Sequence, residues 1–268
     1  MKRRDFLAAS VSAAALAGAE PVVKPMAEEG EPEMPKEYYE LRLVHLRRGP
    51  QVERMNGFLR DAWLPAMGRA GVRPVGVFEV AIGPDSPTLY LLAPFSSLEA
   101  WVQTDEKLAR DEEYLKAGES VINAPATDPA FLRMESSLMV AFEGMPRLEP
   151  PAGAAEHRPR LFELRTYESH SGKGHVKKIE MFNSGEIAIF RRTGLAPVFF
   201  GDTLIGTRQP QLTYMLAFDS PEAREKNWAR FVADPDWKKL STAPGYTDAE
   251  IVSSISNVLL RPTPYSQI

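Results

Sequence analysis

Apolar and polar residues alternate in two short stretches of the chain that are nearly identical. The first reads "YYELRLVH" (Tyr38 to His45) and the second "LFELRTYE" (Leu161 to Glu168). A period of two predicts a β-strand. After each strand the apolar period becomes that of an amphipathic helix, over 51–70 and over 174–193. The apolar helix positions are Val52, Met55, Leu59, Ala62 and Ala66 in the first, and Val176, Ile179, Phe182 and Phe190 in the second, where Glu186 is the one polar break.

The same order of further elements follows both helices. A glycine stands where each helix should end, Gly71 and Gly194. Two strands around a Gly/Pro turn come next, then a helix that begins with the spacing of a capping box, then a last apolar strand. The predicted strands are 75–82, 89–93 and 138–142 in the first stretch and 198–204, 212–218 and 257–260 in the second; the capping boxes are Ser96 to Glu99 and Asp219 to Glu222. This β-α-β-β-α-β order is that of a ferredoxin-like unit.

The two units are copies of each other at a fixed offset of 123 positions. Between Glu40 and Ala100, 16 of the 61 residue pairs at this offset are identical. A single unit leaves one sheet face bare, and two bare faces can cover each other. The sequence therefore predicts an α+β protein in which two tandem ferredoxin-like domains form an intramolecular dimeric α+β barrel with its helices outside. The predicted boundaries are 1–19 for a signal peptide, 20–36 for a linker, 37–143 for the first domain, 144–160 for a second linker and 161–268 for the second domain.

The N-terminus and the composition suggest where the protein acts. The segment "KRRDFL" at 2–7 resembles a twin-arginine export signal, and an Ala-rich run and the cleavage-like Ala17-Gly18-Ala19 follow it. The sequence contains no cysteine, so its core must be stable without disulfides. We expect export to the periplasm or beyond and no membrane span in the mature chain. A net charge of −4 without a basic run argues against a nucleic-acid partner.

The duplicated Glu-Leu-Arg strand is the first candidate for function. Alternation places Phe162, Leu164 and Thr166 on one face, which we expect beneath the helices, and Glu163, Arg165 and Tyr167 on the other, which we expect at the barrel interior or mouth. Glu40 and Arg42 should lie like Glu163 and Arg165. Two interpretations remain open: the four charges form an ion network that fixes the register between the halves, or they line a ligand pocket in which the arginines receive an anion.

At this point the sequence resembles the NIPSNAP family. The resemblance is carried by "FELRTYE", the Gly194 bend, "YMLAFDSPEAREKNWARFVADPDW" and "NVLLRPTPYS" in the second copy, and by "YELR", Gly71 and "FSSLEAW" in a more divergent first copy that lacks the Asp-Pro-x-Trp segment. The resemblance implies a dimeric α+β barrel. It implies no catalytic residues.

Other candidate residues are few. His45 ends the first strand and could act as an acid, a base or a haem ligand, whereas His170 and His175 are predicted to be exposed loop residues. Lys173 in "SGKGH" could bind an anion, although a flexible turn also explains this segment. Trp228, Phe231 and Trp237, with Tyr246 downstream, are either the core face of a helix or the wall of a pocket.

Two hypotheses of function follow. The first is a binding module for a small ligand, or an oligomeric interaction module that could form a homo-oligomer. The alternative is an enzyme of the α+β barrel type, either a cofactor-free monooxygenase or a haem protein, acting on a small aromatic substrate near Arg165, Tyr167 and Tyr214. No metal site or cofactor motif is evident in the sequence, and the choice between binding and catalysis stays open.

Overall fold

The structure is a computed structural model that describes residues 35–156, 158 and 160–268. The expected signal peptide and most of the first expected linker lie outside these residues. The first half of the structure begins with strand β1 (Tyr38–His45) and a long helical segment made of α1 (Pro50–Phe58), η1 (Leu59–Trp63) and α2 (Leu64–Arg69). It continues with β2 (Gly76–Ile82), β3 (Thr88–Phe95), α3 (Leu98–Ala109), α4 (Glu112–Ala117), α5 (Glu119–Ile122) and β4 (Arg133–Ala141).

The second half repeats this order of elements. Strand β5 (Leu161–Glu168) leads to a helical segment made of α6 (Gly172–Met181), η2 (Phe182–Glu186) and α7 (Ile187–Thr193). Then follow β6 (Ala196–Ile205), β7 (Gln211–Phe218), α8 (Pro221–Ala233), α9 (Pro235–Ser241), α10 (Asp248–Ile251) and β8 (Ser254–Pro262). The β-α-β-β-α-β prediction is therefore correct for both copies, with short extra helices before each last strand.

All eight strands close into one antiparallel barrel. Their order is β1-β3-β2-β8-β5-β7-β6-β4. Each half contributes four neighbouring strands, and the halves meet at two seams, β2 with β8 and β4 with β6. Closure leaves no strand of the barrel with a free edge. The predicted α+β barrel built from two repeated halves is confirmed.

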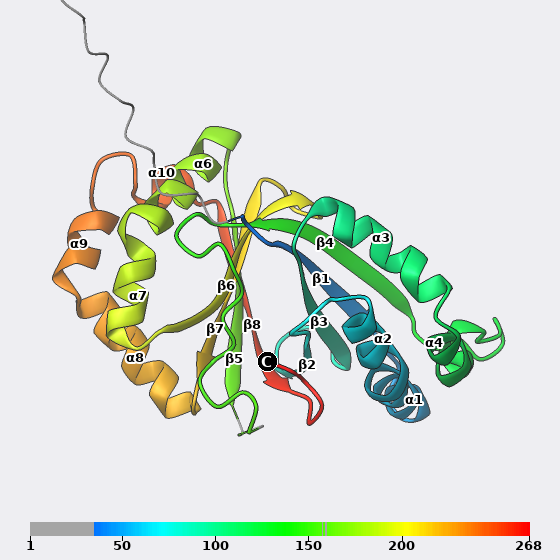
Figure 1. Cartoon of the computed structure of the whole chain (residues 1–268). Helices are drawn as coiled ribbons and strands as arrows, with labels where there is room; N and C mark the ends of the chain where they lie inside the picture. Colours follow the sequence, from blue (N-terminus) through cyan, green and yellow to red (C-terminus); the bar gives the residue numbers. More distant parts are fainter. Residues whose placement is uncertain (1–34, 157, 159) are drawn as a thin grey trace, which may run out of the picture. The chain divides into compact units, whose positions relative to one another are not determined.

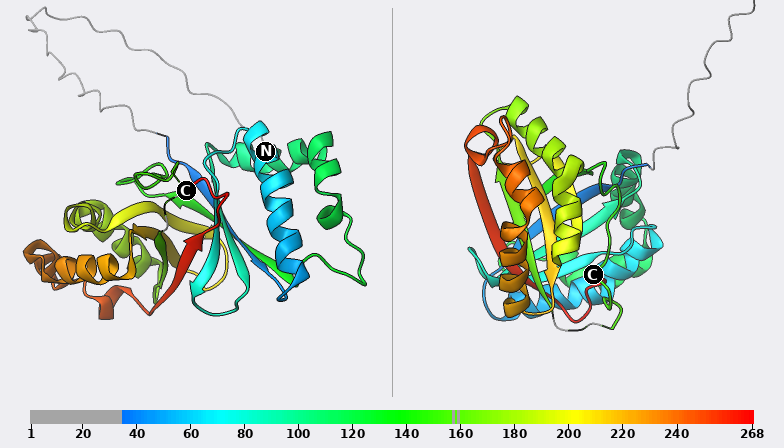
Figure 2. Two further views of the ribbon diagram at one scale, coloured as in Figure 1. Left: turned by 90° about the horizontal axis from the view of Figure 1, so that it is seen from below. Right: turned by 90° about the vertical axis from the view of Figure 1, so that its left-hand side faces the viewer.

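Three apolar clusters fill the fold in layers. One contains residues of both halves, among them Tyr39, Phe78, Phe162 and Phe199, and it occupies the barrel interior. The other two each lie between one half's helices and the outer face of its strands. In Figure 1 the helices of the two halves flank the strands on opposite sides, and the left view in Figure 2 shows the same separation. Both faces of most strands are consequently buried.

The predicted facing of the duplicated strands is wrong. Phe162 and Leu164 point into the barrel interior with Tyr39 and Leu41. Glu163 instead lies on the helix side, where the side chain of Trp228 on α8 donates a hydrogen bond to it. The reversal has a simple cause: the barrel interior is filled by apolar side chains of both halves, whereas the helices bring polar side chains that satisfy the charges.

Two local predictions also need correction. The second helix of each half begins one residue later than the capping-box spacing suggested, because the hydroxyls of Ser97 and Ser220 accept the hydrogen bonds from the amides of Ala100 and Ala223. Val176, expected on the apolar face of its helix, is 63% exposed. The buried face of that helix is carried by its neighbours and includes Lys178.

Both long helical segments contain a π-turn at the same point of the repeat. The turns are η1 and η2, and their bounds differ by the repeat offset. A π-turn inserts an extra residue and rotates the helix that follows, and such turns are frequent at functional sites. In the first half, η1 carries Leu59 and Trp63 toward the strands.

The repeat also extends further along the chain than the sequence comparison indicated. Arg69 pairs with Asp111 at 2.7 Å, and Arg192 pairs with Asp234 at 2.6 Å. Both aspartates cap the helix that follows them, α4 or α9. The first copy thus keeps the Asp of the Asp-Pro-x-Trp segment as Asp111, and Tyr114 stands where the second copy has Trp237. We call these two ion pairs the Arg–Asp clamps.

Candidate functional site

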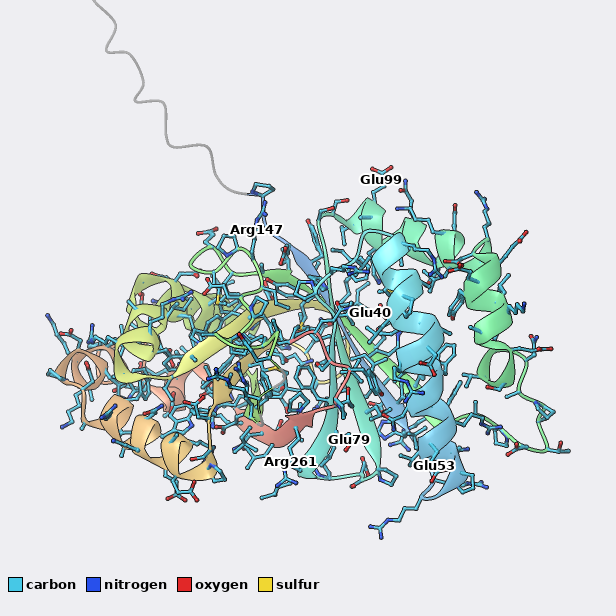
Figure 3. The ribbon with its side chains drawn as sticks, turned by 60° about the horizontal axis from the view of Figure 1, so that its bottom comes forward. Glu40, Glu53, Glu79, Glu99, Arg147 and Arg261 are labelled. Carbon is cyan, nitrogen blue, oxygen red and sulfur yellow. The ribbon has the colours of Figure 1, made fainter. Side chains whose placement is uncertain are left out.

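A cavity of about 460 Å³ lies in the first half between the outer face of β1 and β3 and the surrounding helices. We call it the first-half pocket. Figure 3 labels Glu40 on β1, Glu53 on α1 and Glu99 at the start of α3, which belong to three of the elements that enclose it. Its walls are mainly apolar. They include Val44, Met55, Phe58, Leu59, Trp63, Met67, Leu91, Phe95, Leu108, Val121, Ile122, Phe131 and Met134.

One end of the first-half pocket is polar. The guanidinium of Arg42 donates through Nε and Nη2 to the carboxylate of Glu40, with a shortest distance of 2.9 Å. The hydroxyl of Ser136 donates to Glu40 Oε1 at 2.6 Å, and the indole of Trp101 donates to Oε2 at 3.4 Å. Arg42 keeps 27% of its side chain exposed. The pair is therefore fixed by its neighbours while Arg42 still lines the pocket.

The rim of the pocket carries Asp105 and Tyr114. Asp105 is exposed and Tyr114 is half-buried. Burial raises the pKa of the Tyr114 phenol, Arg42 lowers it, and Asp105 raises it. Tyr114 is positioned by the first Arg–Asp clamp, because the Asp111 carboxylate that Arg69 holds also accepts the backbone N–H of Tyr114. The charges of Arg42 and Asp105 therefore both act on Tyr114 at the polar end of the pocket.

The same region of the second half is filled with aromatic rings. Phe190 packs against Trp228 and Phe231, and Phe231 packs against Trp237 with ring centres 4.3 Å apart. At the repeat offset, several residues that line the first-half pocket are replaced by larger side chains, although Phe58 and Trp63 are replaced by the smaller Met181 and Glu186. The pairs with a larger second residue are Val44 and Tyr167, Leu59 and Phe182, Met67 and Phe190, Leu91 and Tyr214, and Leu108 and Phe231. These substitutions occupy the space that is open in the first half.

Glu163 is the counterpart of Glu40, but four side chains donate hydrogen bonds to it, whereas three donate to Glu40. Arg224 donates to both of its oxygens, at 2.7 and 2.8 Å, and Trp228 donates at 2.9 Å. Arg165 and Asn257 complete the set. Burial alone would raise the pKa of Glu163, but the hydrogen bonds from Arg224 and Trp228 and the charge of Arg165 outweigh it and hold the pKa below its ordinary value. This carboxylate is fully enclosed and paired.

A second buried ion pair lies beside this cluster. The Lys178 ammonium is 3.0 Å from the Glu186 carboxylate, and both side chains are almost completely buried. The ammonium also lies 4.8 Å from the centre of the Phe182 ring. Burial raises the pKa of Glu186, and the Lys178 charge lowers it in part. The polar break at Glu186 was one sign of this pair, but its partner was missed because the π-turn brings together two residues eight positions apart.

The residues singled out from the sequence fall into three places. Glu40 and Arg42 line the first-half pocket. The second-half candidates join the filled cluster instead of a cavity: Glu163, Arg165, Tyr167, Tyr214, Trp228 and Trp237. Tyr167 and Tyr214 bind each other through their hydroxyls at 3.0 Å. The expected pairing of each Glu with its Arg is present, but the two pairs lie each within one half and do not form a network between the halves.

The histidines lie elsewhere. His45 is buried 3.1 Å from the Thr88 hydroxyl and 3.1 Å from the Glu135 carboxylate, and it does not line the first-half pocket. His175 was expected to be exposed, yet it is buried in α6 and lies 2.7 Å from Asp202. His170 is exposed as predicted, and Lys173 is exposed as well. The sequence did not show that α6 packs against β6 and β7, and this packing is what buries His175.

Several pocket residues were missed from the sequence, above all Leu59, Trp63, Trp101 and Tyr114. A comparison of the copies position by position would have found the first-half sites with smaller side chains. None of the lining residues is a histidine or a cysteine, but methionine and tyrosine, which also ligate haem iron, are among them. Across 35–268, with 157 and 159 left aside, no group of three His, Asp or Glu side chains is placed to hold a metal ion.

The model of the NIPSNAP family matches residues 39–143 and 162–267. The chain belongs to the NIPSNAP family. Its two matched regions coincide with the two halves of the barrel. A NIPSNAP protein of unknown function from Agrobacterium tumefaciens is 22% identical over 40% of this chain and 90% of its own, with a TM-score of 0.35. No curated protein matches this NIPSNAP chain.

Two solved structures resemble the whole barrel. A protein from Fusobacterium nucleatum with the provisional description of a monooxygenase gives a TM-score of 0.53 at 6% identity, covering 85% of this chain and 92% of its own. A Lactobacillus acidophilus protein with the same provisional description gives 0.54 at 8% identity, covering 84% and 94%. At such identities the likeness concerns the fold. In the described part of the NIPSNAP chain, no helix is both long and apolar enough to cross a membrane.

Proposed function

We propose that this NIPSNAP protein binds a small, mainly apolar molecule in the first-half pocket. The observation that carries the proposal is the contrast between a cavity of about 460 Å³ in one half and an aromatic filling in the same place in the other. Its volume falls in the range of ligand sites, roughly 300–1,000 Å³. A few fixed polar groups at one end of an apolar cavity are also typical of such sites.

The mouth of the pocket supports the same function. Leu115, Ile122 and Met134 line the pocket and remain 38–47% exposed. Apolar side chains at an opening favour the entry of an apolar molecule, because each buried CH₂ group of the ligand contributes about 0.8 kcal/mol to binding. The ligand would be enclosed by α3, α4 and α5 on one side and by β1 and β3 on the other.

The test uses the neutral apolar fluorophore N-phenyl-1-naphthylamine, whose emission rises when it leaves water. We expect saturable binding to the wild type. Replacing Leu59 by Phe and Leu91 by Tyr gives the first half the second half's own side chains and should abolish the binding, because both residues line the pocket. Thermal unfolding of the double variant serves as the folding control. Equal fluorophore binding by a folded double variant would refute the proposal.

We further propose that the protein is exported by the twin-arginine route and acts in the periplasm. The support is the "KRRDFL" segment and the absence of cysteine. Replacing Arg3 and Arg4 together by Lys should leave the protein in the cytoplasm of an expression host that has a twin-arginine pathway, measured by cell fractionation and immunoblotting. Unchanged export of this variant would contradict the proposal.

A further inference from the structure

In the second half, the indole side chain of Trp228 occupies the position that a ligand could occupy in the first-half pocket. The indole of Trp228 lies over the Arg165 guanidinium, with the arginine Cζ atom 4.7 Å from the ring centre. Its N–H donates to Glu163 Oε2 at 2.9 Å. The ring therefore makes a cation–π contact and a hydrogen bond with the two charges of the Glu-Leu-Arg strand at once.

The first half has the same two charges but not the ring. Glu40, Arg42 and Asp105 stand at the positions of Glu163, Arg165 and Trp228. Asp105 is exposed and lines the first-half pocket together with Arg42. Within residues 35–156, 158 and 160–268, the aromatic contacts include no ring over Arg42, whereas Arg165 has two. The face of the Arg42 guanidinium toward the pocket is thus open to a ligand.

The Oε2 atom of Glu40 can accept a further hydrogen bond, whereas Oε2 of Glu163 already accepts two short ones. Glu163 Oε2 accepts two short hydrogen bonds, at 2.7 and 2.9 Å. Glu40 Oε2 accepts two longer ones, at 3.1 Å from Arg42 and 3.4 Å from Trp101. A carboxylate oxygen with only long contacts can accept a further, better placed donor. Trp101 already donates an indole N–H to this oxygen, but at 3.4 Å, so the oxygen lacks a donor as close as Trp228 is to Glu163 at 2.9 Å.

The charges at the polar end restrict the ligand further. The second half places two arginines, Arg165 and Arg224, on one glutamate. In the first half Trp101 takes the position of Arg224, and the charged residues that line the pocket are Glu40, Asp105 and Arg42. An anionic group would meet more negative than positive charge. This disfavours the anion that the sequence alone had left open.

We propose that the first-half pocket binds a flat aromatic molecule that carries an N–H or O–H donor and no negative charge, with its ring over Arg42 and its donor on Glu40. This rests on the proposed ligand-binding function and defines the class of its ligand. Indole, the side chain of Trp228 as a free molecule, is the matching probe. Benzofuran has the same shape with an oxygen in place of the N–H, so it tests the hydrogen bond alone.

The experiment measures how indole and benzofuran displace N-phenyl-1-naphthylamine from the full chain. We expect indole to compete at roughly tenfold lower concentration than benzofuran, since a hydrogen bond to a charged acceptor is worth about that factor or more. In Glu40→Gln the preference for indole over benzofuran should decrease. Asp105→Trp should abolish indole competition, because it places the second half's own ring in the pocket. Val102→Trp is the matched control, since Val102 is 56% exposed on the same helix and does not line the pocket.

The outcomes separate the two proposals. The inferred ligand class is wrong, and the pocket function stands, if the fluorophore binds but indole and benzofuran compete equally. The same holds if indole displaces the fluorophore from Asp105→Trp as well as it does from Val102→Trp. If the fluorophore does not bind at all, both proposals fail. A complementary variant, Trp228→Ala, should empty the ring position over Arg165. We expect added indole to raise its melting temperature more than benzofuran does, and an equal shift would contradict the inference.

Discussion

The two halves of the barrel share one design and differ in what fills it. Both have a Glu-Leu-Arg strand, a π-turn and an Arg–Asp clamp in the same places. The first half leaves a cavity at this point, and the second packs it with rings and a buried Lys–Glu pair. The difference teaches that the duplicated strand does not by itself determine whether a half contains a cavity. The residues of the helices that face the strand determine whether the space between them is a cavity or is filled by side chains.

The largest expected effect breaks the second half's filling. Met55 occupies the position of Lys178 in the first half. Lys178→Met should destabilise the protein by about 3–5 kcal/mol, because it leaves Glu186 buried without its partner. The loss should be measured by urea unfolding. Replacing Glu186 by Leu in the same chain should recover most of it, since a well-packed apolar pair can match a buried ion pair.

The loss in Lys178→Met should also depend on pH. Burial already raises the pKa of Glu186, and removing the Lys178 charge raises it further. A carboxyl with a raised pKa contributes most to stability when it is protonated, and this contribution is lost as the pH rises through its folded-state pKa. The variant should therefore be closer to the wild type in acid than at neutral pH. A loss that does not change with pH would contradict the assignment.

An intermediate effect sharpens the comparison between the two glutamates. Glu163→Gln should cost roughly 2–3 kcal/mol, whereas Glu40→Gln should cost about 1 kcal/mol, because Glu163 is fully enclosed and has two arginine partners. The pKa of Glu163 lies below its ordinary value, so its contribution is present above the ordinary glutamate pKa and is lost as the pH falls below it. The Glu163→Gln variant and the wild type should converge in acid. Equal losses for the two variants would mean that the halves do not differ as described.

The smallest expected effect tests what the halves have in common. Arg69→Gln and Arg192→Gln each remove one Arg–Asp clamp from an exposed surface, so both losses should be small and similar. Arg192 holds the pKa of Asp234 at about 2. The stability from this clamp is present above the ordinary aspartate pKa and disappears as the pH falls through about 2, where wild type and variant should coincide. Thermal unfolding across this pH range measures both variants. A large loss in one half only would show that the clamps are not equivalent.

The fold could be predicted because the sequence contains two copies of the same unit. A period of two, a period of 3.6 and a repeat at a fixed offset each point to the same β-α-β-β-α-β unit. The sequence could not predict which face of β1 and β5 points into the barrel, because both faces are largely buried. Alternation alone does not say which face the helices cover. The answer lies in Trp101, Arg224 and Trp228, which come about sixty positions later and supply the donors.

The pocket could not be predicted from either copy alone, since a cavity is a shortage of volume and not a motif. Leu59 and Leu91 look like ordinary core residues. Their meaning emerges beside Phe182 and Tyr214, which fill the same positions in the other copy. The Lys178–Glu186 pair escaped for a different reason, because the π-turn changes the helical spacing on which the prediction relied.

The two seams that close the barrel also bear on how the chain is made. During synthesis the first half emerges before β6 and β8 exist, so β4 and β2 have unpaired outer edges and the apolar interior face of four strands is uncovered. Such edges and faces are the places where unfinished chains associate with one another. The nascent first half thus depends on the timely arrival of the second, and we expect that chaperones that shield unfinished chains on the ribosome improve the yield of soluble protein.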